Sequence, residues 1–139
     1  MAEKLTTVGW LETVSLPDWG IKTLVAKIDT GAKTSSIHVE NLQPLDDNHI
    51  QFDVVMSRRN PNKRVTITEK IVRDVVVKSS TGTKTHRYVV QTTMVLGGVS
   101  KVIELTLTSR KRMLRRMLVG RQALEHTFLV DAGKTHLTE

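Results

Sequence analysis

Apolar and polar residues alternate along much of this chain, which is the pattern of β-strands that bury one face. In the clearest case, Ile103–Thr108 follows a strict period of two. Val65–Val77 is a second stretch rich in β-branched residues, and we expect Thr83–Val95 to be its partner strand. The pattern therefore predicts a chain built mainly of strands.

Turn residues separate these predicted strands. Pro, Asp and Gly within Leu16–Gly20 predict a hairpin that joins Val8–Leu16 to Ile21–Ile28. Ser79–Gly82 is expected to join two long arms, and Gly97–Gly98 two more strands. Most neighbouring strands are thus expected to be antiparallel hairpin partners.

Only Gly120–Thr127 has the pattern of a helix, and a short one. Residues 44–47 and 58–64 are polar and predict loops. The chain shows no internal repeat, low-complexity tract or linker. We therefore predict an all-β fold in a single domain over residues 1–139, closed as a β-barrel or folded sandwich, with one short C-terminal helix.

Composition narrows the chemistry. The 139 residues include no cysteine, which excludes disulfides, a cysteine nucleophile and thiolate metal sites and is consistent with a cytoplasmic location. No apolar run approaches the roughly 18 residues of a spanning helix, and Met1–Val8 lacks signal-peptide features. We expect a soluble protein without a membrane partner.

The net charge of +7 favours acidic partners. The densest basic cluster, Ser109–Arg116, is predicted to be a solvated loop that packs Met113, Leu114 and Met117 inward and steers acidic ligands. Aromatic residues make up only 4% of the chain, so a stacking platform for single-stranded nucleic acid is not expected. We predict no nucleic-acid partner.

Several catalytic and cofactor motifs are absent. Gly133–Thr135 resembles the end of a P-loop, but Phe128 stands where that motif needs glycine. The five histidines form no His-Glu-x-x-His pair, and no Gly-x-Ser-x-Gly sequence occurs. The sequence therefore predicts neither a metal site nor a cofactor.

One carboxylate remains of interest. Apolar residues up to Ile28 lead into Asp29, Thr30 and Gly31, and the glycine permits a tight turn. By itself, Asp-Thr-Gly predicts a turn in which the aspartate bonds its own backbone. The same residues are also compatible with one half of a two-carboxylate catalytic site.

Two further features favour the second interpretation: the apolar-Gly-helix sequence Met117–Leu124 and the hairpin around Ser79–Gly82. With them, the chain resembles the bacterial and archaeal retropepsin-like aspartic proteases, a family also called ATP-dependent zinc proteases. Its members are often encoded with, or fused to, ATP-grasp glutamate ligases. The segments that carry the resemblance are Val8–Ile21, Ala26–His38, Val77–Val90, Leu105–Leu124 and Phe128–Asp131.

The resemblance implies a retropepsin-type barrel in which Asp29 is the catalytic carboxylate. Thr30 would brace the loop, and Gly31 and Ala32 would line the cleft with backbone groups. Because the chain has one Asp-Thr-Gly, the resemblance implies a homodimer in which two Asp29 side chains meet on the two-fold axis.

The resemblance also implies a flap, roughly Val75–Tyr88, that closes over a peptide substrate. Its tip would be Ser80, Thr81 and Gly82. Gly120 would pack at the cleft before the short helix. The names of the family imply zinc and ATP, but the residues offer neither a zinc ligand set nor a nucleotide motif.

One departure from the viral relatives is clear. Their catalytic loop continues with acidic residues that pair with the arginine after the later glycine. Here Lys33 and Thr34 take those positions while Arg121 is kept. We expect Arg121 to find another acceptor or to remain available to an acidic substrate, with Lys33 beside it.

The leading hypothesis is an endopeptidase that uses an Asp29 dyad, with acidic or glutamate-rich tails as substrates. The alternative is a catalytically inactive module that binds acidic peptides or an ATP-grasp ligase partner. A third hypothesis, nucleic-acid binding through residues 109–116, is the least favoured because no nucleic-acid motif accompanies the charge.

Overall fold

A computed structural model describes residues 4–46, 48–57, 59–78, 80–109 and 114–138. These residues form ten strands, one 3-10 helix and one short α-helix. In chain order the elements are β1 (Thr6–Leu16), η1 (Pro17–Trp19), β2 (Ile21–Ile28), β3 (Ser35–Pro44), β4 (His49–Val55), β5 (Arg64–Lys70), β6 (Arg73–Lys78), β7 (Lys84–Leu96), β8 (Val99–Thr108), β9 (Met117–Val119), α1 (Arg121–Leu124) and β10 (Phe128–Thr135).

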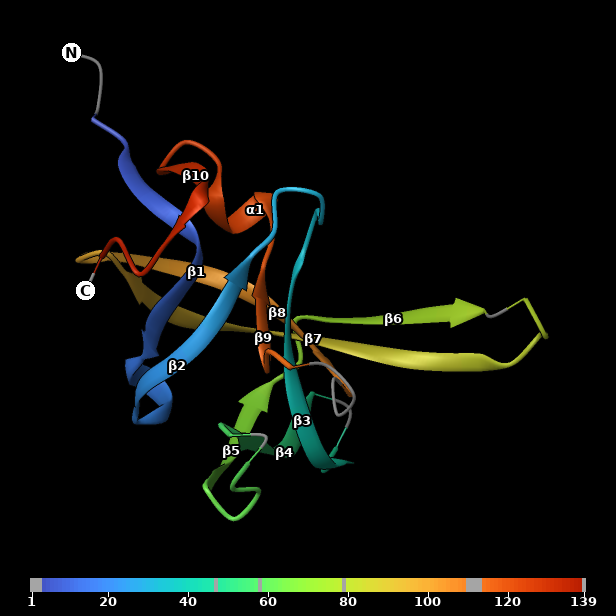
Figure 1. Ribbon diagram of the computed structural model, residues 1–139. Coiled ribbons are helices and arrows are strands. Elements are labelled where there is room, and N and C mark those ends of the chain that lie inside the picture. The colour runs from blue at the N-terminus through green and yellow to red at the C-terminus, as the bar shows by residue number, and fades with distance from the viewer. Residues whose placement is uncertain (1–3, 47, 58, 79, 110–113, 139) are drawn as a thin grey trace.

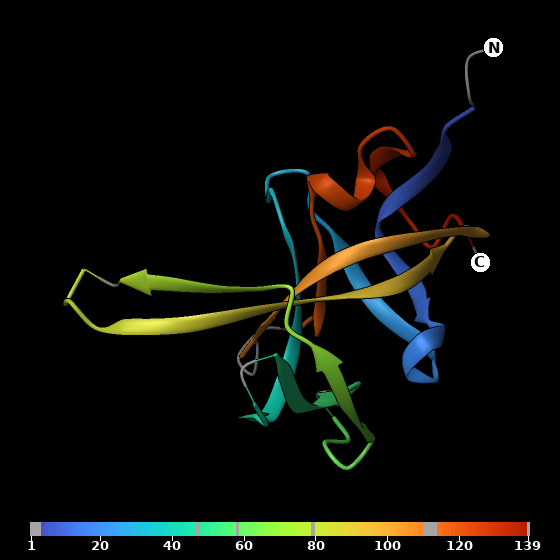
Figure 2. The same cartoon turned by 180° about the vertical axis from the view of Figure 1, so that it is seen from behind.

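Six of the strands form a closed ring. The order is β1–β2–β9–β3–β8–β7, and the pairing of Ser15 with Val95 joins β7 back to β1. β10 lies beside β1, β6 lies outside β7, and β4 and β5 extend from β3. Figure 1 shows that the β6–β7 hairpin projects away from the ring, and Figure 2 shows the same projection from behind.

Local predictions about the elements are confirmed. β1 and β2 form a hairpin around η1, where Gly20 has a φ of 71°. β6 pairs with β7, and β7 with β8 around Gly97 and Gly98, which both have positive φ. The predicted helix is α1. The chain is therefore mainly β, and its sheet closes as a ring.

Alternating burial places the core inside the ring. Ile103, Leu105 and Leu107 on β8 are all buried, while the residues between them are partly exposed. Trp19 packs edge-on against Phe52, with ring centroids 5.5 Å apart. The helix α1 also packs against this core, because Ala123 and Leu124 are part of it. The start of α1, which lies next to Asp29, is thereby anchored to the ring.

A buried carboxylate fastens the C-terminal segment. Glu12 accepts hydrogen bonds from the N–H groups of Gly9, Leu137 and Thr138 and from the Thr138 hydroxyl. Burial raises the pKa of Glu12, but these hydrogen bonds outweigh burial and hold the pKa below its ordinary value. The charged form of Glu12 therefore stabilises the fold.

The expected pairing of Val65–Val77 with Thr83–Val95 is only half right. The chain breaks this stretch at Ile71 and Val72, whose N–H groups donate to Asn48 and Val89. β5 consequently turns back along β4, and only β6 pairs with β7. Local β-propensity is the same on both sides of this break, so it does not distinguish the two partners.

The expectation for the basic cluster is also partly wrong. Residues 110–113, and with them Met113, lie outside the described residues. Met117 is buried as expected, but Leu114 is 62% exposed. Arg116 is instead 7% exposed. The reason is that the ladder of β9 begins only at Met117, so nothing in the sheet holds Leu114 against the core.

Among the described residues, none of the helices is long and apolar enough to cross a membrane.

Candidate active site

Asp29 lies where β2 ends, beside a strand that comes from far along the sequence. β9 sits between β2 and β3, parallel to the first and antiparallel to the second. The Asp29 N–H donates to the Val119 carbonyl at 2.9 Å, which extends the β2–β9 pairing by one residue. The loop that leaves β2 must therefore pass over the end of β9 to reach β3.

The turn expected at Asp29 is present. Its Oδ1 accepts the N–H of Gly31 at 2.9 Å, and its carbonyl accepts the N–H of Ala32 at 3.2 Å. Asp29 is partly exposed, and its Oδ2 makes no hydrogen bond with the described residues. One carboxylate oxygen is therefore fixed by the turn, while the second is available to another molecule.

Gly120 is required by close packing of this loop against β9. A Cβ at Gly120 would lie 2.4 Å from the carbonyl oxygen of Thr34 and 2.8 Å from that of Ala32. Its N–H donates to the Ser35 Oγ at 3.0 Å. No other residue type fits without moving the backbone that follows Asp29.

The start of α1 holds the same loop. The backbone N–H groups of Arg121 and Gln122 donate to the carbonyls of Ala32 and Lys33, at 2.8 and 3.0 Å. The Arg121 side chain donates through Nη1 to the Thr30 carbonyl at 3.0 Å. Arg121 was expected to need another acceptor, because Lys33 and Thr34 replace the acidic loop residues of the viral relatives. Its acceptor is a backbone carbonyl of the Asp29 loop.

A groove of about 560 Å³ begins beside this loop and runs under the base of the β6–β7 hairpin. An adjoining hollow of about 350 Å³ shares part of its wall. Among the predicted substrate contacts, Ala32 lines the groove. The lining residues are Ala32, Thr34, Ser36, Arg73, Val75, Arg87, Val89, Thr106, Thr108, Ser109 and Leu118.

The groove carries positive charge. Arg73 and Arg87 line it from β6 and β7, and the described residues contribute no carboxylate to its wall. Arg73 is paired with Glu104 on β8, whereas Arg87 has no hydrogen bond or ion pair with the described part of the chain. An acidic group entering the groove would therefore meet a cation without an internal partner.

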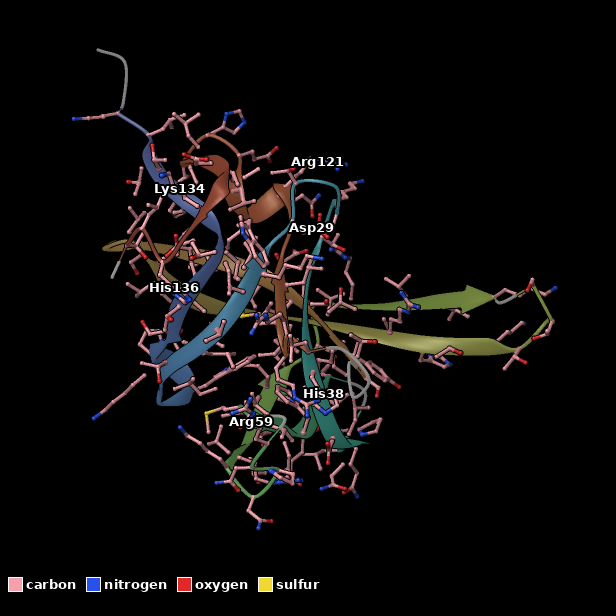
Figure 3. All side chains as sticks on the ribbon, in the orientation of Figure 1. Asp29, His38, Arg59, Arg121, Lys134 and His136 are labelled. Atoms are coloured by element: carbon pink, nitrogen blue, oxygen red, sulfur yellow. The ribbon has the colours of Figure 1, made fainter. Side chains whose placement is uncertain are left out.

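The predicted flap tip is not brought to Asp29 in this structure. Ser80, Thr81 and Gly82 form the end of the β6–β7 hairpin, while Ser79 lies outside the described residues. Figure 3 shows Asp29 and Arg121 together at one end of the ring and the hairpin extending away from them. The base of the hairpin, rather than its tip, lies next to the Asp29 loop, since both line the same groove.

Three residues of this region were missed by sequence reasoning. Ser35 anchors Gly120, and Arg73 and Arg87 line the groove. The arginines face the groove because Arg73 pairs with Val89 and Val75 pairs with Arg87 across the hairpin. The register of the hairpin would have predicted that Arg73 and Arg87 share one face. Ser35 carries no sequence signal beyond its closeness to Asp29.

The described residues do not fit the zinc site that the family name implies. Across the described ranges, no three His, Asp or Glu side chains come together as a metal-binding group. His38 is buried beside Glu40, and His86 pairs with Asp74 on the exposed hairpin, far apart in the chain.

Comparison with known proteins identifies the family of this chain. A sequence model described as RimB-like, retropepsin-like aspartic endopeptidase RimB, matches residues 7–139. The chain belongs to this family. The resemblance carried by the Asp29 loop, the hairpin and the Gly120 segment is thereby confirmed. Membership supports the retropepsin-like fold in general.

Relatives with curated names are longer proteins. The chain is 33% identical over 138 residues to a probable alpha-L-glutamate ligase of Shewanella pealeana, and 36% identical over 132 residues to one of Parasynechococcus marenigrum. These matches cover 97% and 93% of this chain, but only 30% and 28% of the relatives. The chain thus corresponds to less than a third of each ligase.

A solved structure covers the whole fold. The crystal structure of a Legionella pneumophila protein of unknown function superposes with a TM-score of 0.79 at 29% identity. The match covers 98% of this chain and 100% of that protein. The overall fold is therefore shared with a chain that the match spans completely.

Proposed function

We propose that this protein is an aspartic-type endopeptidase in which Asp29 activates the attacking water. The observation that carries the proposal is the Asp29 loop. One carboxylate oxygen is held by the Gly31 N–H at 2.9 Å, and the loop is braced from below by Gly120 and Arg121. Membership of a retropepsin-like family supports the same assignment.

The chemistry needs two carboxylates that share one proton. The ionised carboxylate takes a proton from water as the water oxygen attacks the peptide carbonyl, and the protonated one donates to the carbonyl oxygen. The product of this step is a tetrahedral diol. The C–N bond then breaks as the first carboxyl gives its proton to the leaving nitrogen and the second carboxylate takes a proton from one diol hydroxyl, which releases an acid and an amine and restores the shared proton. Because the sequence has a single Asp-Thr-Gly, the second carboxylate is proposed to come from a second copy of the chain.

Acidic peptides, including glutamate-rich tails, are the proposed substrates. The basic groove next to the loop supports this choice, since Arg73 and Arg87 line it and the net charge of +7 attracts anions from a distance. The β6–β7 hairpin is proposed to close on the bound peptide as a flap. Lys33 on the exposed side of the loop adds to the local charge.

Replacing Asp29 tests the proposal. Asp29→Asn keeps the size of the side chain and is expected to abolish peptide cleavage while the fold persists. The matched control is Asp131→Asn, because Asp131 Oδ1 also accepts the N–H of the glycine two residues later, Gly133, at 3.0 Å, but on the exposed strand β10. Both variants are assayed on a glutamate-rich and a neutral peptide. Full activity of Asp29→Asn would disprove the proposal, and equal rates on both peptides would disprove the acidic preference.

A second candidate function is favoured by the length of the relatives. The chain matches about 30% of proteins named as glutamate ligases, so a module of this fold can accompany a ligase. We propose as the alternative that the chain binds acidic peptides, or such a ligase, without cutting. This alternative predicts peptide binding without cleavage and a monomer in sedimentation, whereas the peptidase predicts cleavage and a dimer.

A further inference from the structure

Arg116 is a buried arginine at the opposite end of β9 from Gly120. Its carbonyl accepts the His38 N–H at 2.7 Å, which fixes its backbone beside β3. Its side chain is only 7% exposed. Three residues of β9 separate it from the Asp29 loop, so it does not take part in the site described above.

Among the described residues, the guanidinium of Arg116 lacks most of the partners that a buried charge needs. Its Nε and Nη1 are shielded from solvent and have no hydrogen-bond partner in the described part of the chain, which leaves three N–H donors unsatisfied there. Arg64 provides the contrast, because it reaches both Glu40 and Asp53. An unpaired buried charge strongly destabilises a protein, so the environment of Arg116 is incomplete without an anion.

Arg116 borders a small pocket with two other cations. The pocket has a volume of about 240 Å³, and its described wall contains three guanidinium groups and no carboxylate. Figure 3 shows Arg59 well separated from Asp29. The lining residues are Val25, Met56, Ser57, Arg59, Leu114, Arg115 and Arg116.

We propose that this pocket binds a phosphate group. A phosphate carries about two negative charges and three strong acceptor oxygens, and therefore matches three guanidinium groups better than a carboxylate with one charge. The Ser57 Oγ accepts the Asn60 N–H at 3.2 Å, so its hydroxyl proton remains available to the ligand. Arginine is the preferred residue for such oxyanions because its donors form a planar fork.

Binding requires a local adjustment. Because Nε and Nη1 of Arg116 are closed off from solvent, the guanidinium must turn toward the pocket that it borders before it donates to the phosphate. The gain is that guanidinium nitrogens with no partner among the described residues acquire a phosphate oxygen as acceptor. The site does not depend on the proposed peptidase activity, since it shares no residue with the Asp29 loop or the basic groove.

Calorimetric titration of the full chain with inorganic phosphate tests the proposal. Phosphate is expected to bind and to raise the melting temperature, while acetate at equal ionic strength is not. Arg116→Met should weaken phosphate binding about tenfold or more, because charge-assisted hydrogen bonds are lost. Lys22→Gln, which removes an equal charge from an exposed position on β2, is the matched control and should leave binding unchanged.

Arg59→Gln gives a second test that does not alter a buried group. It should weaken phosphate binding several-fold and remains informative if Arg116→Met fails to fold. O-phosphoserine replaces inorganic phosphate in a further titration. Tighter binding of O-phosphoserine would identify a phosphorylated side chain as the ligand, and tighter binding of inorganic phosphate would identify the free ion. No binding of either compound, an equal effect of acetate, or equal binding by wild type and Arg59→Gln would overturn the proposal.

Discussion

Gly120→Ala is the sharpest test of how the Asp29 loop is held. The added Cβ would lie 2.4 Å from the Thr34 carbonyl oxygen and 2.8 Å from that of Ala32, both well inside van der Waals contact. These atoms are backbone, so no side chain can move aside. Overpacking of this kind costs about 1–3 kcal/mol, and loss of the hydrogen bond to Ser35 adds about 1 kcal/mol.

The free energy of unfolding, measured in urea, gives this cost directly. Gly133→Ala is the matched control, since its Cβ would meet only Asp131 Oδ1 at an ordinary 3.5 Å. This control should change stability by less than about 1 kcal/mol. If cleavage is observed for the wild type, Gly120→Ala should also lower kcat, because the carboxylate moves with the loop. A stability loss no larger than that of Gly133→Ala would refute the packing argument.

Two further predictions concern single contacts. Glu12→Gln should lower the free energy of unfolding by about 2 kcal/mol at neutral pH. Because the pKa of Glu12 in the folded protein lies below its ordinary value, this loss should fade as the pH falls through the ordinary pKa and then the folded pKa. A loss that stays constant in urea unfolding at different pH values would contradict this prediction. Arg121→Met should remove the hydrogen bond to the Thr30 carbonyl and reduce kcat about tenfold with little loss of stability, whereas unchanged kcat would show that this contact does not position the loop.

Features set by neighbouring residues could be predicted from the sequence. The hairpin around Gly20 and the alternating burial of Ile103–Thr108 follow from turn chemistry and a period of two. The turn at Asp29, with its bond from Gly31, follows in the same way. These are short-range effects, and the short helix after Gly120 is another.

Features set by distant residues could not be predicted in this way. The insertion of β9 between β2 and β3 joins segments about eighty to ninety residues apart, and no local pattern specifies such a pairing. The same limit explains the incorrect partner for Val65 and the basic groove under the hairpin base. Arg116 is the extreme case, because charge alone predicts an exposed side chain.

The central claim is that two copies of Asp29 act together on one peptide. The most direct test mixes wild type with Asp29→Asn, allows subunits to exchange, and measures cleavage of a glutamate-rich peptide at constant total protein. If each site needs Asp29 from both copies, activity falls as the square of the wild-type fraction and reaches about one quarter at equal mixing. A linear fall, to about one half at equal mixing, would show that each copy acts alone and would contradict the account.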